Sequence, residues 1–184
     1  MKFLIYLSLV FLCSELLIAI RKYNFKTKKS IKKDRYSLLF FWIIIPISIT
    51  FAFITAYYET WHKREKIIGI TGGLIAISGL ILRWFAIYQL QQQFTVNVSI
   101  VDKHQLITGK LYKFVRHPAY LGLWIFAFGL GLAMNSFVSL LILVTAFSIS
   151  IYYRIYVEEQ LLEKIFGQKY IKYKKTTPKL FPIK

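Results

Sequence analysis

The chain has 184 residues, of which 57% are hydrophobic and 18% aromatic, and its formal net charge is +17. A soluble domain is typically about 45–50% apolar, so this composition argues against a soluble globular protein and favours an integral membrane protein. A charge of this size on a soluble protein would suggest nucleic acid, but here the basic residues lie between long apolar runs, which indicates an anionic membrane surface and no nucleic-acid partner.

Five apolar runs along the chain predict five transmembrane helices. They are Phe3–Ile20, Ser37–Tyr57, Ile67–Leu90, Ala119–Met134 and Phe137–Tyr153. About 20 helical residues are needed to cross the hydrocarbon core, so the first three runs are long enough and the last two are short. Only Asn135 and Ser136 separate the last two runs, and because these residue types favour turns, we expect a tight helical hairpin. The sequence therefore predicts an all-α integral membrane protein, with residues 1–184 forming a single domain.

The distribution of Lys and Arg predicts which side of the membrane each loop faces. With five spans, the loop Arg21–Tyr36, the loop Gln91–His117 and the tail from Arg154 share one side, and together they carry 20 Lys and Arg residues. The other side carries four. Because positively charged loops stay in the cytoplasm, we expect the N-terminus outside and the C-terminus in the cytoplasm.

The third apolar run contains two features that bear on helix packing. Its four glycines indicate a close approach to another helix; they are Gly69, Gly72, Gly73 and Gly79. Arg83 lies in the same run, about two turns from its cytoplasmic end. Its side chain either extends to the membrane surface or faces a polar cavity, and the sequence leaves both interpretations open.

The first polar segment with unusual chemistry is HQLITGKLYKFVRHPAYLG, residues 104–122. Thr108-Gly109 predicts a turn, and Pro118 suits the first turn of the following helix. His117 then lies at the membrane boundary, beside a helix N-terminus whose free N–H groups can hold a carboxylate. The alternative is that the Arg116-His117 pair only contacts lipid headgroups.

The second polar segment, residues 154–182, follows the last apolar run. Arg154 and Glu158 are four residues apart and share a helix face. One interpretation is an ordinary surface ion pair with Glu159 solvated; the other is that carboxylates at the edge of the hydrocarbon bind a positive group. Because a hairpin returns its two ends to one membrane face, we expect both polar segments to be neighbours in space.

An apolar stripe at helical spacing follows the two glutamates and predicts a C-terminal cytoplasmic amphipathic helix. Its members are Val157, Leu161, Leu162, Ile165 and Phe166. We expect the lysine-rich end of this region, residues 169–175, to meet anionic headgroups. The sequence has no phosphate-binding glycine loop and no Cys/His cluster with zinc spacing, so no metal site is predicted.

The two polar segments together carry the patterns RHPxYxG, R-x3-EE and FG-x2-Y-x2-Y, in that order and with the hairpin between them. In these motifs the chain resembles the isoprenylcysteine carboxyl methyltransferase family, which is related to the membrane phospholipid methyltransferases. The resemblance covers roughly Phe94 to Pro182. The chain departs from it at Lys110-Leu111, where many relatives have Gly-Pro.

The resemblance implies a five-span membrane enzyme that binds S-adenosylmethionine in a cytoplasm-facing pocket of its C-terminal half, residues 91–184. It implies cofactor contacts from His104, Gln105, Leu106, Ile107, Tyr112, His117, Pro118, Ala119, Tyr120 and Glu158. It also implies catalytic roles for Arg154, Glu158 and His117, with Arg154 placed toward the methyl acceptor. The implied acceptor is lipidic, a carboxylate of the isoprenylcysteine type; a phospholipid amine or a small thiol stays open.

The chemistry of S-adenosylmethionine suits these polar residues. Glu158 can hold a cationic part of the cofactor, the helix start at His117 can receive its carboxylate, and Tyr112 and Tyr120 can pack near its adenine or sulfonium. A carboxylate acceptor needs no general base, whereas an amine must lose a proton, for which His117 or Glu159 is the candidate.

Two other classes of protein share some of these features. A non-catalytic membrane scaffold would keep the spans and the basic loops, but it has no need of His117, Arg154 and Glu158 together. The C-terminal region also resembles that of membrane sterol reductases, whose usual greater length argues against that interpretation. Binding of S-adenosylmethionine distinguishes the methyltransferase from a scaffold, whereas nicotinamide-dependent turnover would favour a reductase.

Overall fold

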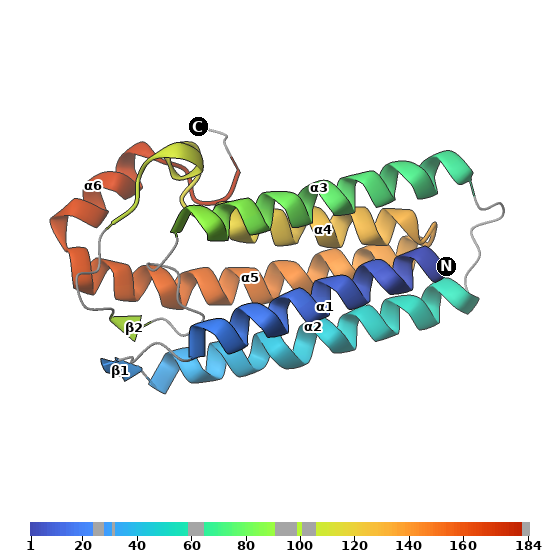
Figure 1. Cartoon of the computed structure of the whole chain (residues 1–184), viewed down its shortest axis with the longest axis horizontal. Helices are drawn as coiled ribbons and strands as arrows, with labels where there is room; N and C mark the ends of the chain where they lie inside the picture. The colour runs from blue at the N-terminus through green and yellow to red at the C-terminus, as the bar shows by residue number, and fades with distance from the viewer. Residues whose placement is uncertain (24–27, 31, 59–64, 91–98, 101–105, 182–184) are drawn as a thin grey trace.

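The computed structural model describes residues 1–23, 28–30, 32–58, 65–90, 99–100 and 106–181. Five long helices run side by side along the longest axis of the molecule (Figure 1). They are α1 (Lys2–Tyr23), α2 (Lys32–Tyr58), α3 (Lys66–Leu90), α4 (Pro118–Ala133) and α5 (Phe137–Phe166). The shorter elements are the strands β1 (Lys28–Ser30) and β2 (Ser99–Ile100), the 3-10 helix η2 (Lys110–Lys113) and the helix α6 (Gln168–Thr176).

The long helices confirm a helical membrane architecture. Within the described part of the chain, α1, α2, α3 and α5 are long and apolar enough to cross a membrane. The helix α4 has 16 residues, which corresponds to about 24 Å, less than the hydrocarbon thickness of about 30 Å. Its side chains are largely buried by the other helices. Length and composition thus support four spans, with α4 as a shorter helix inside the bundle.

The helices α3 and α4 pack with their backbones in contact. A Cβ atom placed at Gly72 would lie 2.3 Å from the backbone nitrogen of Ala133, and one placed at Gly129 would lie 2.3 Å from that of Ala76. Only glycine permits such an approach. The predicted close packing of the third apolar run is therefore correct, and its partner is α4.

The turn between α4 and α5 confirms the predicted helical hairpin. Asn135 has a left-handed backbone conformation, with φ of 52°. The side chain of Ser136 accepts a hydrogen bond from the backbone nitrogen of Ser139 and caps the start of α5. The Asn-Ser pair therefore reverses the chain direction and begins the next helix.

The helix α5 does not end at Tyr153, where its apolar run ends, but continues to Phe166. The apolar stripe that predicts a separate amphipathic helix is therefore part of α5. No glycine or proline interrupts the segment before Gly167, so the helical hydrogen bonds continue beyond the apolar run. The chain changes direction at Gly167, with φ of 51°, and a separate nine-residue helix, α6, follows.

The polar elements gather at one end of the bundle. Figure 1 shows β1, β2 and α6 at this end, whereas the N-terminus and the turn between α4 and α5 lie at the other. The two short strands pair antiparallel, with Lys28 opposite Ile100, and are an addition to the predicted all-α fold. Two basic segments and the C-terminal region thus share one end.

Candidate active site at the polar end of the bundle

Both polar segments meet at this end, as predicted. The backbone nitrogen of Arg116 donates to the carbonyl of Pro178 at 2.9 Å, and that of His117 donates to the carbonyl of Lys179 at 3.2 Å. The hydroxyl of Tyr173 on α6 donates to the backbone carbonyl of Tyr112. These contacts hold the start of α4 against the C-terminal segment.

Glu159 lies at the centre of this junction. Its Oε1 atom is 3.1 Å from Nε2 of His117 and 3.1 Å from Nη1 of Arg116. Its Oε2 atom is 3.8 Å from Nζ of Lys174 and 3.7 Å from Nζ of Lys179. Glu159 is only 6% exposed, so the interpretation that it is solvated is wrong. The start of α4 and the segment after α6 cover it.

His117 occupies the N-cap position of α4, without a capping hydrogen bond from its side chain, and is buried, with 4% exposure. Pro118 occupies the first position of the helix, as predicted. The His117 ring faces Glu159 rather than Glu158. Four basic side chains surround the carboxylate of Glu159.

Tyr120 connects His117 to Glu158. Its hydroxyl donates to Oε2 of Glu158 at 2.9 Å, and its ring centroid lies 5.8 Å from that of His117. Tyr120 and Glu158 come from different helices, α4 and α5. The structure therefore brings together three of the residues that the motifs single out.

Arg154 lies one turn before Glu158 on α5 and is 5% exposed. Its Nη1 atom donates to Oγ of Ser37 in α2 at 2.8 Å. A pair with Glu158 is one of the two interpretations that the sequence leaves open. The sequence gives no signal for Ser37, which is only the first residue of an apolar run. Arg154 thus occupies a buried position between α5 and α2.

Tyr112 belongs to η2 and packs against α3. Its hydroxyl donates to the carbonyl of Ala86 at 3.3 Å. Burial raises the pKa of this hydroxyl far above its ordinary value, and nearby Glu158 raises it further. Burial also raises the pKa of Tyr173 to about 12. Both phenols therefore stay protonated hydrogen-bond donors at neutral pH.

The turn before Tyr112 has an unusual backbone. Lys110 has a φ of 56°, in the left-handed region, whereas Gly109 has a φ of −95°. The turn is present close to the predicted Thr108-Gly109 position. The strained residue, however, is Lys110 and not the neighbouring glycine.

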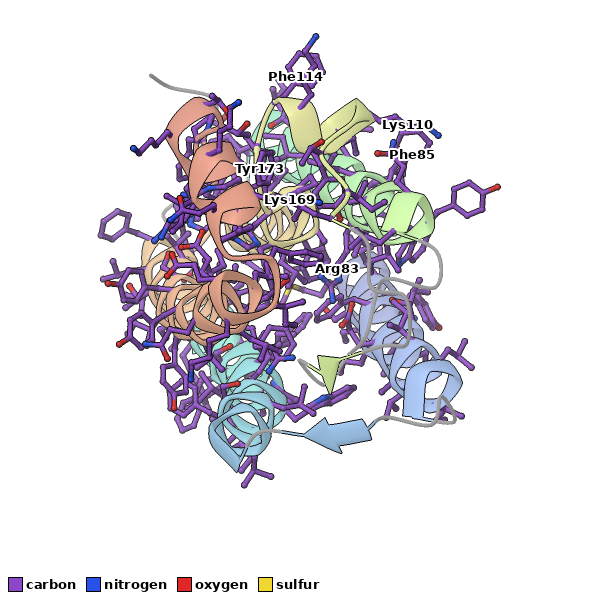
Figure 2. All side chains as sticks on the ribbon, turned by 90° about the vertical axis from the view of Figure 1, so that its left-hand side faces the viewer. Arg83, Phe85, Lys110, Phe114, Lys169 and Tyr173 are labelled. Atoms are coloured by element: carbon purple, nitrogen blue, oxygen red, sulfur yellow. The ribbon has the colours of Figure 1, made fainter. Side chains whose placement is uncertain are left out.

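The segment before this turn is described only in part. His104 and Gln105 lie outside the described residues, while Leu106 and Ile107 are half-buried. Leu106 also borders a groove of about 950 Å³ between this segment and α6. The remaining lining residues are Thr108, Lys113, Phe114, Lys169, Lys172, Tyr173, Thr176, Thr177 and Pro178. Figure 2 shows Lys169 and Tyr173 on the α6 side of this region.

Arg83 follows neither of the two interpretations left open by the sequence. It pairs with Glu15 of α1, with Nε and Nη2 at 2.5 and 2.6 Å from the two carboxylate oxygens. The sequence contains a signal for this pair that pattern analysis missed. Glu15 is a carboxylate within the first apolar run, where an unpaired charge is costly.

Comparisons with known proteins bear on the identity of the chain. A model of the isoprenylcysteine carboxyl methyltransferase (ICMT) family matches residues 72–164, half of the chain. The chain belongs to the isoprenylcysteine carboxyl methyltransferase family. The match covers α4, most of α3 and most of α5, which include Tyr120, Arg154 and Glu158.

Individual relatives agree with this assignment. The chain is 36% identical over 107 residues to protein-S-isoprenylcysteine O-methyltransferase of Schizosaccharomyces pombe, an alignment that covers 57% of this chain and 45% of the relative. It is 28% identical over 129 residues to the Homo sapiens protein of the same name, covering 66% and 44%. The chain thus spans about half the length of these curated relatives.

A solved structure shares the fold. The eukaryotic intramembrane Ras methyltransferase ICMT superposes with a TM-score of 0.69 at 25% identity, over 75% of this chain and 52% of that one. The helical membrane arrangement described above is therefore that of the family.

Proposed function

We propose that this chain is an integral membrane methyltransferase that transfers a methyl group from S-adenosylmethionine to a lipidic carboxylate of the isoprenylcysteine type. The observation that carries the proposal is the Tyr120–Glu158 hydrogen bond, which joins the RHPxY and EE motifs of the family within residues 72–164. A scaffold has no need to bury His117 and Glu159 at this junction, or Arg154 between α5 and α2.

The proposed cofactor fits the chemistry of the junction. S-adenosylmethionine supplies an electrophilic methyl group on a sulfonium, and it also carries an ammonium and a carboxylate. Glu158 is half-buried and suits a cationic group, while the N-terminus of α4 favours an anionic one. The proposed contacts come from two stretches and a helix. They are His104, Gln105, Leu106, Ile107 and Tyr112, then His117, Pro118, Ala119 and Tyr120, and Glu158 on α5.

Arg154 is the proposed ligand of the acceptor carboxylate. Its guanidinium is buried between α5 and α2, and the residue lies one helical turn before Glu158. A planar guanidinium orients a carboxylate through paired hydrogen bonds. A carboxylate acceptor needs no proton removal, so alignment supplies the main acceleration, for which about 7–11 kcal/mol is available.

An amine acceptor is the second candidate, and the geometry disfavours it. An amine must lose a proton, and the two candidate bases, His117 and Glu159, face each other at 3.1 Å. Glu159 is further occupied by three other basic side chains. A carboxylate acceptor therefore suits the junction better than an amine.

For the membrane arrangement we propose five spans in one domain, with α4 as a short fifth span, the N-terminus outside and the C-terminus cytoplasmic. The excess of Lys and Arg in the loops at the polar end supports this orientation. We further propose that α6 is the amphipathic C-terminal helix at the membrane surface, because it buries Tyr170 and Tyr173 and exposes Lys169, Lys172 and Lys175.

We also propose that the groove beside α6 contacts anionic headgroups. Lys113, Lys169 and Lys172 line it from two elements, and each basic residue near an anionic surface contributes about 1 kcal/mol. Replacing the three with Gln should weaken binding of the purified protein to phosphatidylglycerol vesicles. The comparison is Lys175→Gln, an exposed α6 lysine outside the lining; a loss there larger than the average loss per groove lysine would contradict the assignment.

The deciding experiment uses purified full-length protein with methyl-labelled S-adenosylmethionine. It compares an N-acetylated prenylcysteine, phosphatidylethanolamine and a small thiol as acceptors. We expect the wild-type protein to incorporate label into a base-labile methyl ester of the prenylcysteine. The Glu158→Gln variant should incorporate none. The control is Glu163→Gln, a half-exposed carboxylate on the same helix. Label in the phospholipid would support the amine alternative, and failure to bind the cofactor would support a scaffold.

A further inference from the structure

An ion pair buried inside the bundle joins α1 to α3. Arg83 contacts both carboxylate oxygens of Glu15, and the two residues are 5% and 6% exposed. Figure 2 shows Arg83 in the interior of the bundle. The fold alone does not require such a pair, because apolar residues of similar volume stabilise a protein interior at least as well. Ionised residues within membrane spans are therefore candidates for a functional role.

The third nitrogen of the guanidinium connects this pair to the candidate site. Nη1 of Arg83 donates to the backbone carbonyl of Ala119 at 3.2 Å, in the first turn of α4. A carbonyl oxygen has two lone pairs, so it can accept this bond in addition to one within the helix. The next residue is Tyr120, whose hydroxyl donates to Glu158. Polar contacts thus run from α1 through α3 and α4 to α5.

Glu15 acts on the side chain of Arg83 and not on its backbone. A Cβ atom placed at Gly122 would lie 2.7 Å from the backbone nitrogen of Arg83, so α3 is already held against α4 at this level. The paired contact with Glu15 fixes the plane of the guanidinium and leaves Nη1 directed at Ala119. Without the carboxylate, the buried cation would turn toward another acceptor.

We propose that Glu15 is a positioning residue of the methyl-transfer site. By fixing Arg83, it holds the carbonyl of Ala119 and with it the first turn of α4, from which Ala119 and Tyr120 contact the cofactor. This inference rests on the proposed function. It extends the site to α1, which lies outside the residues 72–164 matched by the family model.

The test is the substitution Glu15→Gln, which removes the charge and keeps the shape. We expect the KM for S-adenosylmethionine and its Kd to rise about tenfold, because a displaced contact residue costs cofactor alignment. A purely structural defect lowers the amount of active enzyme, and with it the apparent kcat, but leaves KM unchanged. The KM therefore separates positioning from folding.

The matched control is Ser14→Ala. Ser14 joins α1 to α3 through a different contact, in which Nε1 of Trp84 donates to its hydroxyl at 3.3 Å on the exposed side. Its removal should leave KM unchanged. A rise in KM equal to that of Glu15→Gln would show that any loosening of α1 has the same effect, and would overturn the proposal.

The charge exchange Glu15→Arg with Arg83→Glu is a second test. It replaces the first if Glu15→Gln does not accumulate as folded protein. The exchange keeps one acid and one base, so thermal stability should recover. KM should stay raised, because a carboxylate at position 83 cannot donate to the carbonyl of Ala119. Recovery of both thermal stability and KM in the exchange variant, or an unchanged KM in Glu15→Gln, would overturn this inference but not the proposed function. Wild-type protein that binds no S-adenosylmethionine would overturn the proposed function and this inference with it.

Discussion

The membrane-embedded part of the bundle and its polar end both bury charged side chains, but they balance the charge differently. Inside the bundle, Arg83 and Glu15 form one pair with contacts at 2.5 and 2.6 Å. At the polar end, Glu159 has four basic neighbours at 3.1 to 3.8 Å. The embedded pair is neutral, as a hydrocarbon environment requires, whereas the Glu159 cluster keeps a positive excess that water and anionic headgroups can balance.

This difference indicates what each cluster does. The Arg83–Glu15 pair has a defined orientation, because a bidentate contact fixes the plane of the guanidinium. The Glu159 cluster instead joins separate segments, since its neighbours come from the start of α4, from α6 and from the segment after α6. We therefore expect the cluster to hold these segments together and the pair to set the geometry of the site.

Glu159→Gln should be among the substitutions with the largest effect on stability. Removing the negative charge leaves the buried Arg116 and His117 without their shared counter-charge, and breaking a buried ion pair in this way costs about 3–5 kcal/mol of the free energy of unfolding. Thermal unfolding of the detergent-solubilised protein should shift down accordingly.

The control for this substitution is Glu163→Gln on the same helix. Glu163 contacts Lys174 at 2.5 Å, but both side chains are more than a third exposed. Surface pairs of this kind contribute about 0–1 kcal/mol. Equal losses of unfolding free energy in the two variants would mean that burial of Glu159 has no bearing on stability.

The sequence predicts the main framework because the signals for it are local. Apolar runs indicate the long helices, and Asn135-Ser136 indicates the hairpin. That hairpin in turn brings the two polar segments to one end. The sequence also points to Tyr120 and Glu158, through family motifs rather than through periodicity.

Other features depend on tertiary contacts that local patterns do not contain. Glu158 and Glu159 are adjacent, and helical spacing alone does not reveal which of them the C-terminal segment covers. Glu15 and Arg83 are 68 residues apart, and their pairing depends on how α1 docks on α3. The continuation of α5 to Phe166 was missed because the end of an apolar run is not the end of a helix.

Apolar replacement of the embedded pair sharpens the comparison. Glu15→Leu alone leaves Arg83 without its counter-ion and should cost about 3–5 kcal/mol. Adding Arg83→Met removes the charge, so the double variant should recover to within about 1 kcal/mol of wild type, since apolar isosteres can replace a buried pair. Chemical denaturation in mild detergent measures both variants. A double variant as unstable as the single one would mean that the pair itself holds the bundle together.

At the polar end, Lys110→Gly should stabilise the protein. The left-handed conformation costs a non-glycine residue about 1–2 kcal/mol, and the greater flexibility of glycine in the unfolded chain offsets about 0.5–1 kcal/mol of that gain. We expect a net increase of about 0.5–1 kcal/mol in the free energy of unfolding. The control is Gly109→Ala, at a φ of −95° with open space around the added Cβ, which should not be destabilising. A loss of stability in Lys110→Gly would mean that the lysine side chain matters more than the backbone.

The smallest expected change in stability concerns an exposed neighbour of Glu159, which is compared with a buried one. The side chain of Lys179 is 44% exposed and that of Arg116 is 7% exposed. Lys179→Gln should cost about 0.2–1 kcal/mol, and this cost should vanish in 1 M salt, where the screening length is about 3 Å. Arg116→Gln should cost more, and its cost should persist in salt because solvent ions do not reach the contact. Equal salt dependence of the two variants would mean that the polar end is hydrated throughout. It would then differ from the embedded part by the presence of water as well as by its net charge.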